Sequence, residues 1–419
     1  MNNNPFNEGS LKKIWLKYFN NSKDGESFNF IKNVSFIKNK RLPIYVNIGV
    51  NLTSGITYKF SKDDCTDYKG KVFVIRDIPS YHNLEDFNND GALKLKKLFQ
   101  YEGYTTEVSN YESLDQYMKS VFKSNSRYKF RRNIERLELC FDIKYTMYYG
   151  KISSEELECV FDVFYTLLEK RYSDKQERCG ELDSNLWSYY VELAYIMINN
   201  KKASLFVVYD NNKPIGITFN YHFDSILIEA LTVFDIDYYK FNIGHTTIYK
   251  LLEWSFNNNI TLFDYTHGDF DYKKRWSDNR YQKHHHLIYD SSSVLCNILA
   301  FGIKKKFDFK RILRDKKIIK KYNDFVYKWS NINAKKSTRQ DRFKIDLIDK
   351  EDLDYNQSDL INIYDENQMS LRKAIFDYYY KSPELILNVE FYKCNSSENC
   401  FYAIGLKNNL RLIKLSINK

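Results

Sequence analysis

The sequence predicts a mixed α/β fold of the α+β kind, with a mixed central sheet flanked by helices, and three observations predict it. Apolar residues recur at helical spacing through much of 113–199. Three strand-like runs follow between residues 203 and 233, and the letters DNNKP at 210–214 mark a hairpin between the first two. A helical pattern at 244–257 then precedes a short apolar strand at 260–263, so helices and strands are mixed along the chain.

The first 125 residues are expected to form a smaller unit of the same kind. The run 71–78 is apolar and rich in β-branched residues, which is typical of a buried strand. Apolar residues in 90–101 predict a helix, and 105–109 a short extended strand. Helical patterns then occupy 113–139, 160–171 and 186–199. We therefore expect a strand-helix-strand unit that precedes the main domain.

The end of the chain has a different pattern. From about residue 343, a helix at 370–381 is followed by strand-like runs at 385–391, 400–406 and 410–417, which predicts a small C-terminal α+β extension. A length of 419 residues predicts two or three structural units, and the patterns along the chain divide it into four segments. Their predicted boundaries are 1–125, 126–300, 301–342 and 343–419.

Positive charge is concentrated in one segment. The chain carries a net charge of +10, and residues 304–344 contain sixteen Lys and Arg against four Asp, a segment charge of +12. Apolar residues recur between these cations, so 301–342 is predicted as a basic amphipathic helical segment. Such a helix can lie on an anionic membrane surface, and an ordinary solvated helix is an equally good interpretation. A nucleic-acid partner is the weakest choice, because no recognition motif accompanies the charge.

Several classes of protein are excluded or disfavoured by composition. Hydrophobic residues make up 43%, enough for a core, but no run of eighteen apolar residues predicts a membrane span. The N-terminus lacks the apolar core of a signal peptide. Seven scattered cysteines fit a reducing cytosol, and Cys394 and Cys400 are expected as ordinary thiols. We expect a cytoplasmic protein, in possible peripheral contact with the inner membrane face.

Polar residues gather where the strand at 260–263 ends. Asp264, His267 and Asp269 stand there, and functional groups concentrate at the carboxyl ends of strands in such folds. Asp264 and His267 are the favoured candidates for a base, although Asp and Gly also build tight turns. Glu229 interrupts the apolar strand ILIEALTV, so it lies on a solvated face or in a site that raises its pKa. His222 is a further candidate, for which a structural role is more common.

Two basic groups suit anionic ligands. Arg127 and Arg131 are four residues apart, as are Arg132 and Arg136, so they form adjacent stripes on one predicted helix. Guanidinium groups bind phosphate or carboxylate through paired hydrogen bonds, whereas neighbouring glutamates allow a merely solvated face. Lys273 is a second candidate for binding an anionic substrate group. No metal site is expected, because the three consecutive histidines at 284–286 alternate direction in a strand.

Three segments together resemble a known family. These are SRYKFRRNIERLE at 126–138, the hairpin from 203 to 223, and FDYTHGDFDYKKRW ending at Trp276. They are similar to the CelD-like and FemAB-like branch of the GNAT superfamily of acyltransferases, over roughly residues 70–330. In the signature that follows the strand, the matching positions are Asp264, Gly268, Tyr272, Lys273 and Trp276. The resemblance implies a GNAT fold with two similar halves, of which the first is degenerate.

The resemblance also implies a place for a thioester donor. In the simple GNAT pattern the pantetheine arm lies in a splay between two central strands, and the pyrophosphate binds backbone N–H groups at a helix start. The matching window here is KFNIGHT at 240–246, where Gly244 fits and Thr246 replaces a small residue. Gly244, His245, Thr246 and Thr247 are the implied cofactor residues, and Thr246 and Thr247 are expected to offer N-cap hydroxyls. The implied cofactor is acyl-CoA or an acyl carrier thioester, without a metal.

The resulting expectation is an N-acyltransferase that moves an acyl group from a thioester to an amine of an amino sugar, amino acid or lipid precursor. Cell-envelope or polysaccharide biosynthesis would use such a reaction. The base would be chosen from Asp264, His267 and Glu229, and Tyr272 would protonate the leaving thiolate. Arg127, Arg131, Arg132, His222, Asp269 and Lys273 would bind substrate. The alternatives are a FemAB-like transferase that uses aminoacyl-tRNA, and an inactive GNAT-fold binding protein in surface-polysaccharide assembly.

Overall fold

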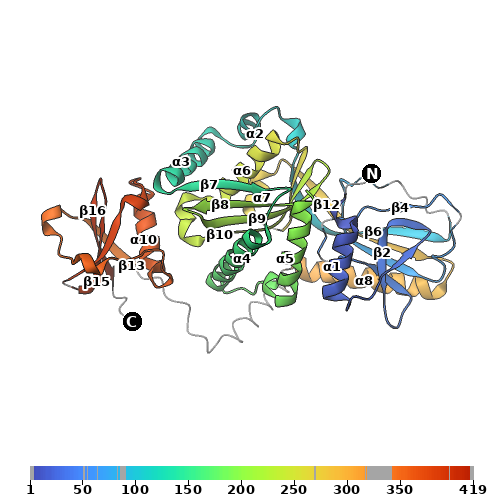
Figure 1. Cartoon of the computed structure of the whole chain (residues 1–419). Helices are drawn as coiled ribbons and strands as arrows, with labels where there is room; N and C mark the ends of the chain where they lie inside the picture. Colours follow the sequence, from blue (N-terminus) through green and yellow to red (C-terminus); the bar gives the residue numbers. More distant parts are fainter. Residues whose placement is uncertain are drawn as a thin grey trace.

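A computed structural model of the chain describes residues 4–50, 52, 53, 55–63, 65–82, 84, 91–268, 270–316, 318, 342–395 and 397–415. One large sheet runs through most of the molecule, with helices on its faces, and a smaller unit lies at one end (Figure 1). The mixed α/β fold with a helix-flanked central sheet, predicted from the sequence, is confirmed.

The N-terminal half contains α1 (Gly9–Phe19) and six strands. The strands are β1 (Glu26–Phe28), β2 (Ile31–Lys38), β3 (Ile44–Asn47), β4 (Lys59–Phe60), β5 (Val72–Pro79) and β6 (Leu93–Thr106). The second half begins with α2 (Leu114–Val121), α3 (Ser124–Cys140), β7 (Ile143–Tyr148), α4 (Ser154–Lys175) and α5 (Ser184–Asn199). It continues with β8 (Ala203–Asp210), β9 (Lys213–Phe223), β10 (Ile226–Phe234), η4 (Ile236–Phe241), α6 (Ile243–Asn257), β11 (Leu262–His267), α7 (Asp271–Trp276), β12 (Asn279–Asp290) and α8 (Val294–Asp315).

The large sheet has twelve strands and a repeated order. Its path is β1-β2-β3-β5-β12-β6-β11-β10-β9-β8-β7, with β4 paired to β2. Two pairs are parallel, β3 with β5 and β10 with β11, and the other pairs are antiparallel. Each half thus has a parallel pair followed by an antiparallel strand taken from the other half. β6 follows β5 in the chain but pairs with β11, and β12 follows β11 but pairs with β5.

This exchange of strands joins the two halves into one sheet. In the second half α6 connects the parallel strands β10 and β11, whereas no α-helix is assigned to the described residues between β3 and β5. The first half is therefore the reduced copy. The predicted boundaries at 125/126 and 300/301 fall inside α3 and α8, which each continue across them.

One predicted helix is wrong. The segment 90–101 was expected to be helical, but from Leu93 onward it belongs to β6, and residue 90 lies outside the described part. β6 pairs with β12 over most of its length and with β11 at its end, so it lies at the centre of the sheet. The apolar residues of LKLKKLF fit both the helical period of 3.6 residues and the strand period of 2. Pairing with β12 and β11 stabilises the strand.

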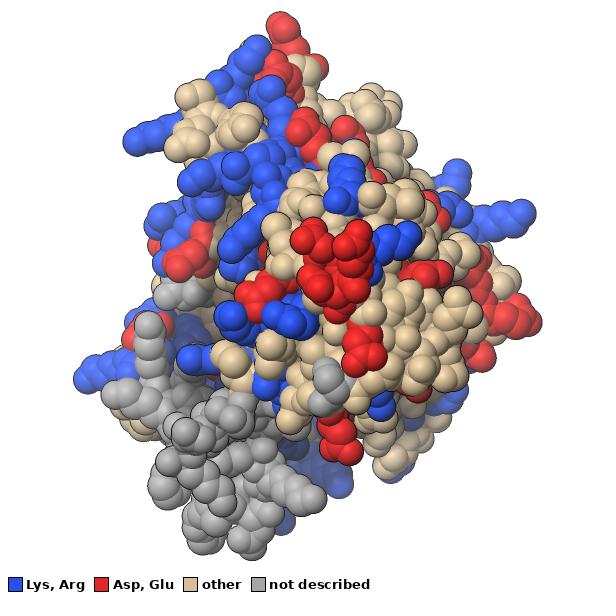
Figure 2. Space-filling model, turned by 90° about the vertical axis from the view of Figure 1, so that its left-hand side faces the viewer, with Lys and Arg blue, Asp and Glu red and all other residues tan. Residues whose placement is uncertain are grey.

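Charge is separated on the surface. Seen from the end that carries the C-terminal unit, Lys and Arg side chains gather along one side, and Asp and Glu side chains form a group near the middle (Figure 2). Of the predicted basic helical segment 301–342, the residues up to 315 are in α8, and 317 and 319–341 lie outside the described residues. No helix in the described part of the chain is long and apolar enough to cross a membrane.

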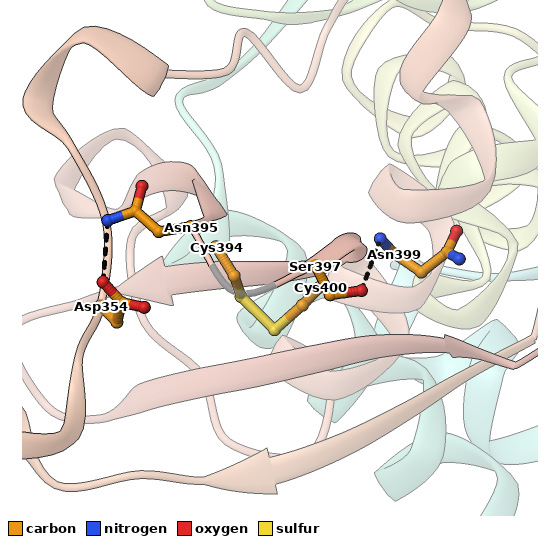
Figure 3. Close-up of a disulfide and its surroundings, with 6 residues drawn as sticks. All are labelled: Asp354, Cys394, Asn395, Ser397, Asn399 and Cys400. Carbon is orange, nitrogen blue, oxygen red and sulfur yellow. Dashed lines mark hydrogen bonds between the residues drawn. A yellow bond between two sulfur atoms is a disulfide. The ribbon is translucent and has the colours of Figure 1, made fainter.

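The C-terminal unit is a four-stranded antiparallel sheet with one α-helix packed beside it. Its strands are β13 (Arg342–Leu347), β14 (Glu390–Cys394), β15 (Ser397–Ile404) and β16 (Asn409–Leu415), in the order β13-β16-β15-β14, and its helix is α10 (Met369–Tyr379). Cys394 and Cys400 form a disulfide, which corrects the expectation of ordinary thiols (Figure 3). The hairpin of β14 and β15 places the Cα atoms of the two cysteines 5.2 Å apart, although the residues are six positions apart in the chain.

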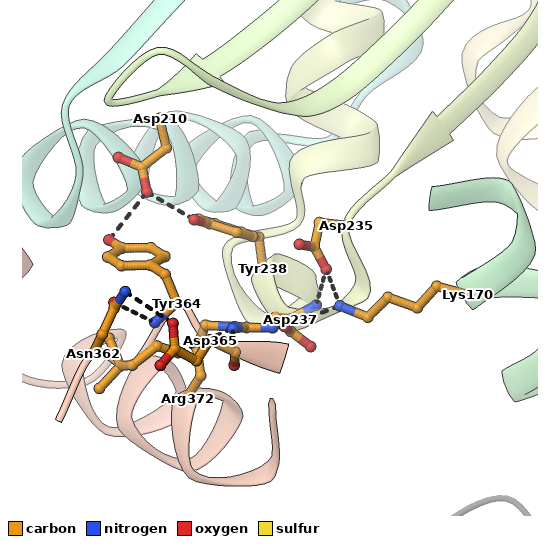
Figure 4. A network of polar contacts seen from close by, with 10 residues as sticks. Lys170, Asp210, Asp235, Asp237, Tyr238, Asn362, Tyr364, Asp365 and Arg372 are labelled. Atoms are coloured by element: carbon orange, nitrogen blue, oxygen red, sulfur yellow. Dashed lines mark hydrogen bonds and ion pairs between the residues drawn. The ribbon is translucent and has the colours of Figure 1, made fainter. Parts of the chain in front are cut away.

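The C-terminal unit docks on the second half through a buried polar network (Figure 4). Arg372 of α10 bonds to Asp237 at 2.6–2.7 Å, and both side chains are almost fully buried. Lys170 of α4 reaches the same Asp237 at 3.0 Å and Asp235 at 2.6 Å. Rings of α10 pack beside this network, with Phe376 at 4.9 Å from Tyr238. The unit therefore holds η4, the turn that leads into α6.

Candidate active site

The parallel strands β10 and β11 splay apart after three paired residues. The last pair is Ile228 with Asp264, and a bulge on β10 follows between Glu229 and Leu231. Glu229 therefore lies where the two strands diverge. Its side chain is 4% exposed, and no described residue donates a hydrogen bond to its Oε2 atom. A buried carboxyl oxygen without a partner is costly, so its position at a strand splay indicates a functional role.

Burial sets the protonation of Glu229. It raises the pKa of this carboxyl to about 7, with a further rise from the carboxylate of Asp264, while the cations of Lys273 and Arg171 oppose the rise. A group with this pKa exchanges protons near neutral pH. Of the two alternatives expected for Glu229, the structure shows the buried position with a raised pKa and not the solvated face.

Asp264 is fully buried beside Glu229 and is tied to two tyrosines. Tyr81 donates to its Oδ2 at 2.8 Å, and Tyr281 donates at 2.8 and 2.9 Å to the two oxygens. The backbone N–H of Thr266 adds a fourth contact at 2.7 Å. Burial, and then the Asp264 carboxylate, raise the pKa of both tyrosines well above the ordinary value. Three donor groups thus hold the oxygens of Asp264, whereas Glu229 has a carboxyl oxygen without a partner and is better placed to take a proton.

Gly103 on β6 makes the contact of Tyr281 possible. A Cβ atom at this glycine would overlap the ring of Tyr281. Tyr281 is the cross-strand partner of Gly103, so its ring crosses β6 at this position to reach Asp264 on β11. A larger residue would push the ring away from the carboxylate.

Lys273 lies along the open edge of β11. Its ammonium donates to the backbone carbonyls of Tyr265 and His267, and to the Thr266 hydroxyl at 3.1 Å. Thr266 has a positive φ of 61°, which turns the end of the strand around the ammonium. Burial lowers the pKa of Lys273, and the charges of Glu229 and Asp264 counter this. Because all three ammonium protons have acceptors, Lys273 acts on the site through its charge.

Tyr272 and His267 lie at the rim of this cluster. Burial, and then the charge of Glu229, raise the pKa of Tyr272, so its phenol stays protonated. The ring of His267 lies 4.5 Å from that of Tyr101, and the residue is exposed. Crowding by protein atoms and the cations of Lys283, Lys273 and Arg314 lower the pKa of His267, which favours the neutral ring. Asp269 lies outside the described residues.

The first turn of α6 holds the four implied cofactor residues. The N-cap is Asn242, with φ of 59°, so the expectation that Thr246 and Thr247 offer cap hydroxyls is wrong. Both are buried inside the helix, and the Thr247 hydroxyl donates to the carbonyl of Ile243 at 3.0 Å. A Cβ atom at Gly244 would lie 2.8 Å from the ring of Phe234. Gly244 is thus needed for helix packing, and this turn does not reproduce the open glycine turn of the simple coenzyme pattern.

His245 is committed to a structural contact. Trp276 of α7 donates from Nε1 to His245 Nδ1 at 2.6 Å, and the two rings stack at 5.9 Å. Burial, and then Arg275, lower the pKa of His245 to about 4. The neutral ring therefore fixes the start of α6 against the short helix that carries Lys273.

The arginines of α3 flank this region without entering the cluster. Arg127 donates to the carbonyl of Phe122 at 2.6 Å, Arg132 lies over the ring of Tyr128, and Arg131 is exposed. The helix is linked to α7 through Ser126, which accepts a bond from Arg275 at 3.4 Å. α3 therefore presents cations beside α7 and the start of α6.

His222 and the three consecutive histidines have other surroundings. The buried ring of His222 bonds to Ser204 at 2.8 Å and packs on Tyr149 at 4.4 Å, apart from Glu229 and Asp264. His285 accepts from the N–H of Asp77 at 3.2 Å, and His286 bonds to the hydroxyl of Tyr58 at 2.6 Å. Among the described residues there is no group of three metal-ligating side chains close enough to hold an ion.

The first half contains a closed counterpart of the splay. β3 and β5 also pair over three residues, ending at Val46 and Val74. The next residue, Asn47, is buried and bridges the gap by accepting from the N–H of Arg76 at 3.0 Å. An amide with a hydrogen bond thus stands where the second half has the carboxyl of Glu229. Of the two matching positions, the one in the second half therefore carries the ionisable group.

Two clefts on the surface lie away from this cluster. One of about 620 Å³ is lined by the β2–β3 turn and residues such as Trp15 and Arg76 in the first half. The other, of about 410 Å³, lies between the end of α3 at Leu139 and Leu406 of the C-terminal unit. Chemistry, rather than cavity size, therefore singles out the splay.

The structure brings together four of the residues predicted from the sequence, together with two tyrosines that were not predicted. Glu229, Asp264, Tyr272 and Lys273 meet at the splay, as the charge couplings among them show. Tyr81 was missed because it lies 183 residues before Asp264 in the chain, and Tyr281 because it lies on β12, across β6 from Asp264. Their only local signal is an aromatic residue near a predicted strand, which is common in any core.

Comparison with known proteins supports the GNAT assignment for one segment. Residues 124–274 match the family described as "Acetyltransferase (GNAT) domain". The match covers 151 of the 419 residues and extends from the start of α3 into α7, so it includes both strands of the splay, Glu229 and Lys273. The order of β7 to β10, α6 and β11 in this segment is the GNAT-type arrangement expected from the sequence. No curated protein matches the chain.

Several solved structures have a related shape at low identity. A crystal structure of FemX matches with a TM-score of 0.41, 12% identity, and coverage of 61% of this chain and 83% of that one. L-PGS from Bacillus licheniformis matches with a TM-score of 0.40 and 13% identity, over 73% of this chain and 98% of that one. A conserved protein of unknown function from Bacteroides thetaiotaomicron matches with a TM-score of 0.39 and 11% identity, over 69% of this chain and 92% of that one.

Proposed function

We propose that the chain is an N-acyltransferase whose reaction takes place at the splay of β10 and β11, with Glu229 as the base. The observation that supports this is a buried carboxyl with a pKa of about 7, inside the segment that matches an acetyltransferase domain. Acyl transfer to an amine needs a group that removes a proton from the attacking nitrogen near neutral pH. Glu229 meets this requirement, and its free Oε2 can receive that proton.

In the proposed reaction the amine nitrogen forms a bond to the acyl carbon, and the bond from that carbon to the leaving sulfur or oxygen breaks. The proton lost by the amine goes to Glu229, and the leaving group is released as its anion or takes a proton from water. Tyr272 is a poor proton donor because its pKa is raised, so it contributes a hydrogen bond instead. The positive charge of Lys273 lies beside the place where negative charge develops.

The closed first turn of α6 bears on the donor. Gly244 is covered by Phe234, and the N–H groups of His245 and Thr246 already donate to the carbonyl of Asn242. These residues do not fit the pyrophosphate of coenzyme A as the simple pattern requires, and no proposed step depends on it. The proposed donor is therefore a thioester of either kind, acyl-CoA or an acylated carrier protein. The proposed acceptor is the amine of an amino sugar, an amino acid or a lipid.

A second candidate follows from the same closed turn. An aminoacyl-tRNA donor has no pyrophosphate to bind at α6, and the arginines on α3 offer cations for a nucleic-acid backbone. The leaving group would then be a ribose hydroxyl. Glu229 would act on the acceptor amine in the same way.

The test is a transfer assay with three labelled donors. The purified chain is incubated with acetyl-CoA, an acylated carrier protein or aminoacyl-tRNA, each with a panel of amino sugars, amino acids and aminolipids. We expect transfer with at least one donor, and a loss of about 100-fold or more in Glu229→Gln, since a general base contributes about 10²–10⁴-fold.

Glu253→Gln is the matched control, because Glu253 is a surface residue of α6. Its activity should equal that of the wild type, and thermal unfolding should show that both variants are folded. Transfer from aminoacyl-tRNA alone would select the second candidate. Equal rates for Glu229→Gln and the wild type would remove Glu229 as the base, and no transfer with any donor would favour a binding protein.

A further inference from the structure

α8 exposes a row of large apolar side chains that does not face the protein. Val294, Ile298, Phe301, Phe309 and Ile312 follow each other at spacings of four, three, eight and three residues, so they share one side of the helix. Together with Leu295 they are between 46% and 75% exposed. We call these six residues the outer stripe of α8.

The outer stripe is not the face that anchors the helix. Cys296, Ala300 and Phe307 are buried against a cluster that includes Val72 and Leu287 of the sheet. At about 100° per residue these anchors lie roughly opposite the outer stripe. Arg311 and Arg314 also bond inward, to the carbonyls of Phe99 and Gln100 on β6. The helix is thus fixed to the sheet on one side and apolar on the other.

Exposed apolar residues are common when they are scattered, but these lie along one side of a single helix. In the described part of the chain, 21 large apolar residues are exposed, and six of them form the outer stripe of this one helix. A concentration of this kind on a single surface marks an interaction site.

Charge identifies the occupant. α8 carries six Lys and Arg against two Asp, a net charge of +4. Lys304 and Lys306 flank the outer stripe on its two sides, and Lys305 lies within it, with its ammonium 5.5 Å from the centre of the Phe301 ring. An apolar band bordered by lysines suits the boundary between acyl chains and anionic headgroups, where lysine ammonium groups extend toward the headgroups.

We propose that the outer stripe of α8 docks the protein on an anionic lipid bilayer, with the helix lying in the plane of the interface. The proposal is independent of the acyl-transfer chemistry, because it rests on α8 alone. It places the protein at a membrane surface, where a lipid-linked acceptor would be within reach.

The experiment measures binding of the full-length protein to vesicles by co-sedimentation. The probes are vesicles of phosphatidylcholine alone and of phosphatidylcholine mixed with phosphatidylglycerol. We expect the wild type to bind the anionic vesicles, and binding to weaken at high salt. Ile298→Asp combined with Phe301→Asp should lower the affinity at least tenfold, because two apolar side chains leave the lipid. Both residues are exposed, so the fold should be unaffected.

Leu406→Asp is the matched control, since Leu406 is an 80% exposed apolar residue of the C-terminal unit. It should bind vesicles as the wild type does. Absence of wild-type binding to anionic vesicles, or equal binding by the double variant, would overturn the proposal. So would a dimer of the wild type that the same double variant dissociates, because the outer stripe would then be an interface between two copies of this chain.

Discussion

Replacing Glu229 by glutamine should change how stability depends on pH. Burial raises the pKa of Glu229 from 4.5 to about 7, so between these values the folded protein binds a proton that the unfolded chain has lost. The free energy of unfolding therefore falls as pH rises through this window. The shift corresponds to about 3 kcal/mol, at 1.36 kcal/mol for each pKa unit. Glutamine cannot ionise, so the variant should lack this decrease.

The assay is urea unfolding followed by tryptophan fluorescence at several pH values from about 5 to about 8. At each pH the unfolding free energy of Glu229→Gln is subtracted from that of the wild type. The difference should change by up to about 3 kcal/mol across the series, with the wild type relatively most stable at the acidic end. The glutamine amide can add a constant offset of about 1–3 kcal/mol, which subtraction across pH removes.

Glu253→Gln serves as the control, because its side chain is on the surface, and its difference from the wild type should be small at every pH. A difference between the wild type and Glu229→Gln that stays constant from pH 5 to pH 8 would refute the reasoning. It would mean that Glu229 has an ordinary pKa in the folded protein and is unsuited to act as the base.

Two further changes test the surroundings of the site. Tyr281→Phe removes the hydroxyl that donates to Asp264. In a urea titration it should lower the free energy of unfolding by about 2 kcal/mol, as expected for a hydrogen bond to a charged group. Tyr195→Phe, at an exposed tyrosine, is the control and should change the free energy of unfolding little. Arg372→Met leaves the buried carboxylate of Asp237 without its arginine and should cost about 3–5 kcal/mol in differential scanning calorimetry, and an unchanged transition would show that the C-terminal unit does not depend on this contact.

Much of the fold was readable from local patterns. The hairpin of β8 and β9, the helix α6 and the short strand β11 were all predicted near their observed positions, because their periodicity and turn residues act over a few neighbouring positions. Asp264 was identified for the same reason, since it directly follows an apolar run. Family resemblance in the same stretch led to the GNAT arrangement that the match at 124–274 supports.

Other features could not be read from neighbouring residues. The helical prediction at 90–101 failed because β6 owes its conformation to β12 and β11, which follow more than 150 residues later. The disulfide between Cys394 and Cys400 was missed because it depends on a hairpin that places two Cα atoms 5.2 Å apart. Both features depend on strand pairing, which local sequence patterns do not report.

The sequence by itself indicated the helices α4 to α6 and the strands β8 to β11 of the second half, and placed Asp264, Tyr272 and Lys273 at or after the short strand β11. The tertiary structure alone decided that Glu229 is buried with a raised pKa and that Tyr81 and Tyr281 hold Asp264. Hydrophobic periodicity reports on each segment separately, whereas the pKa of a carboxyl depends on the burial and charges that surround it. Those surroundings exist only when strands from both halves of the chain meet in one sheet.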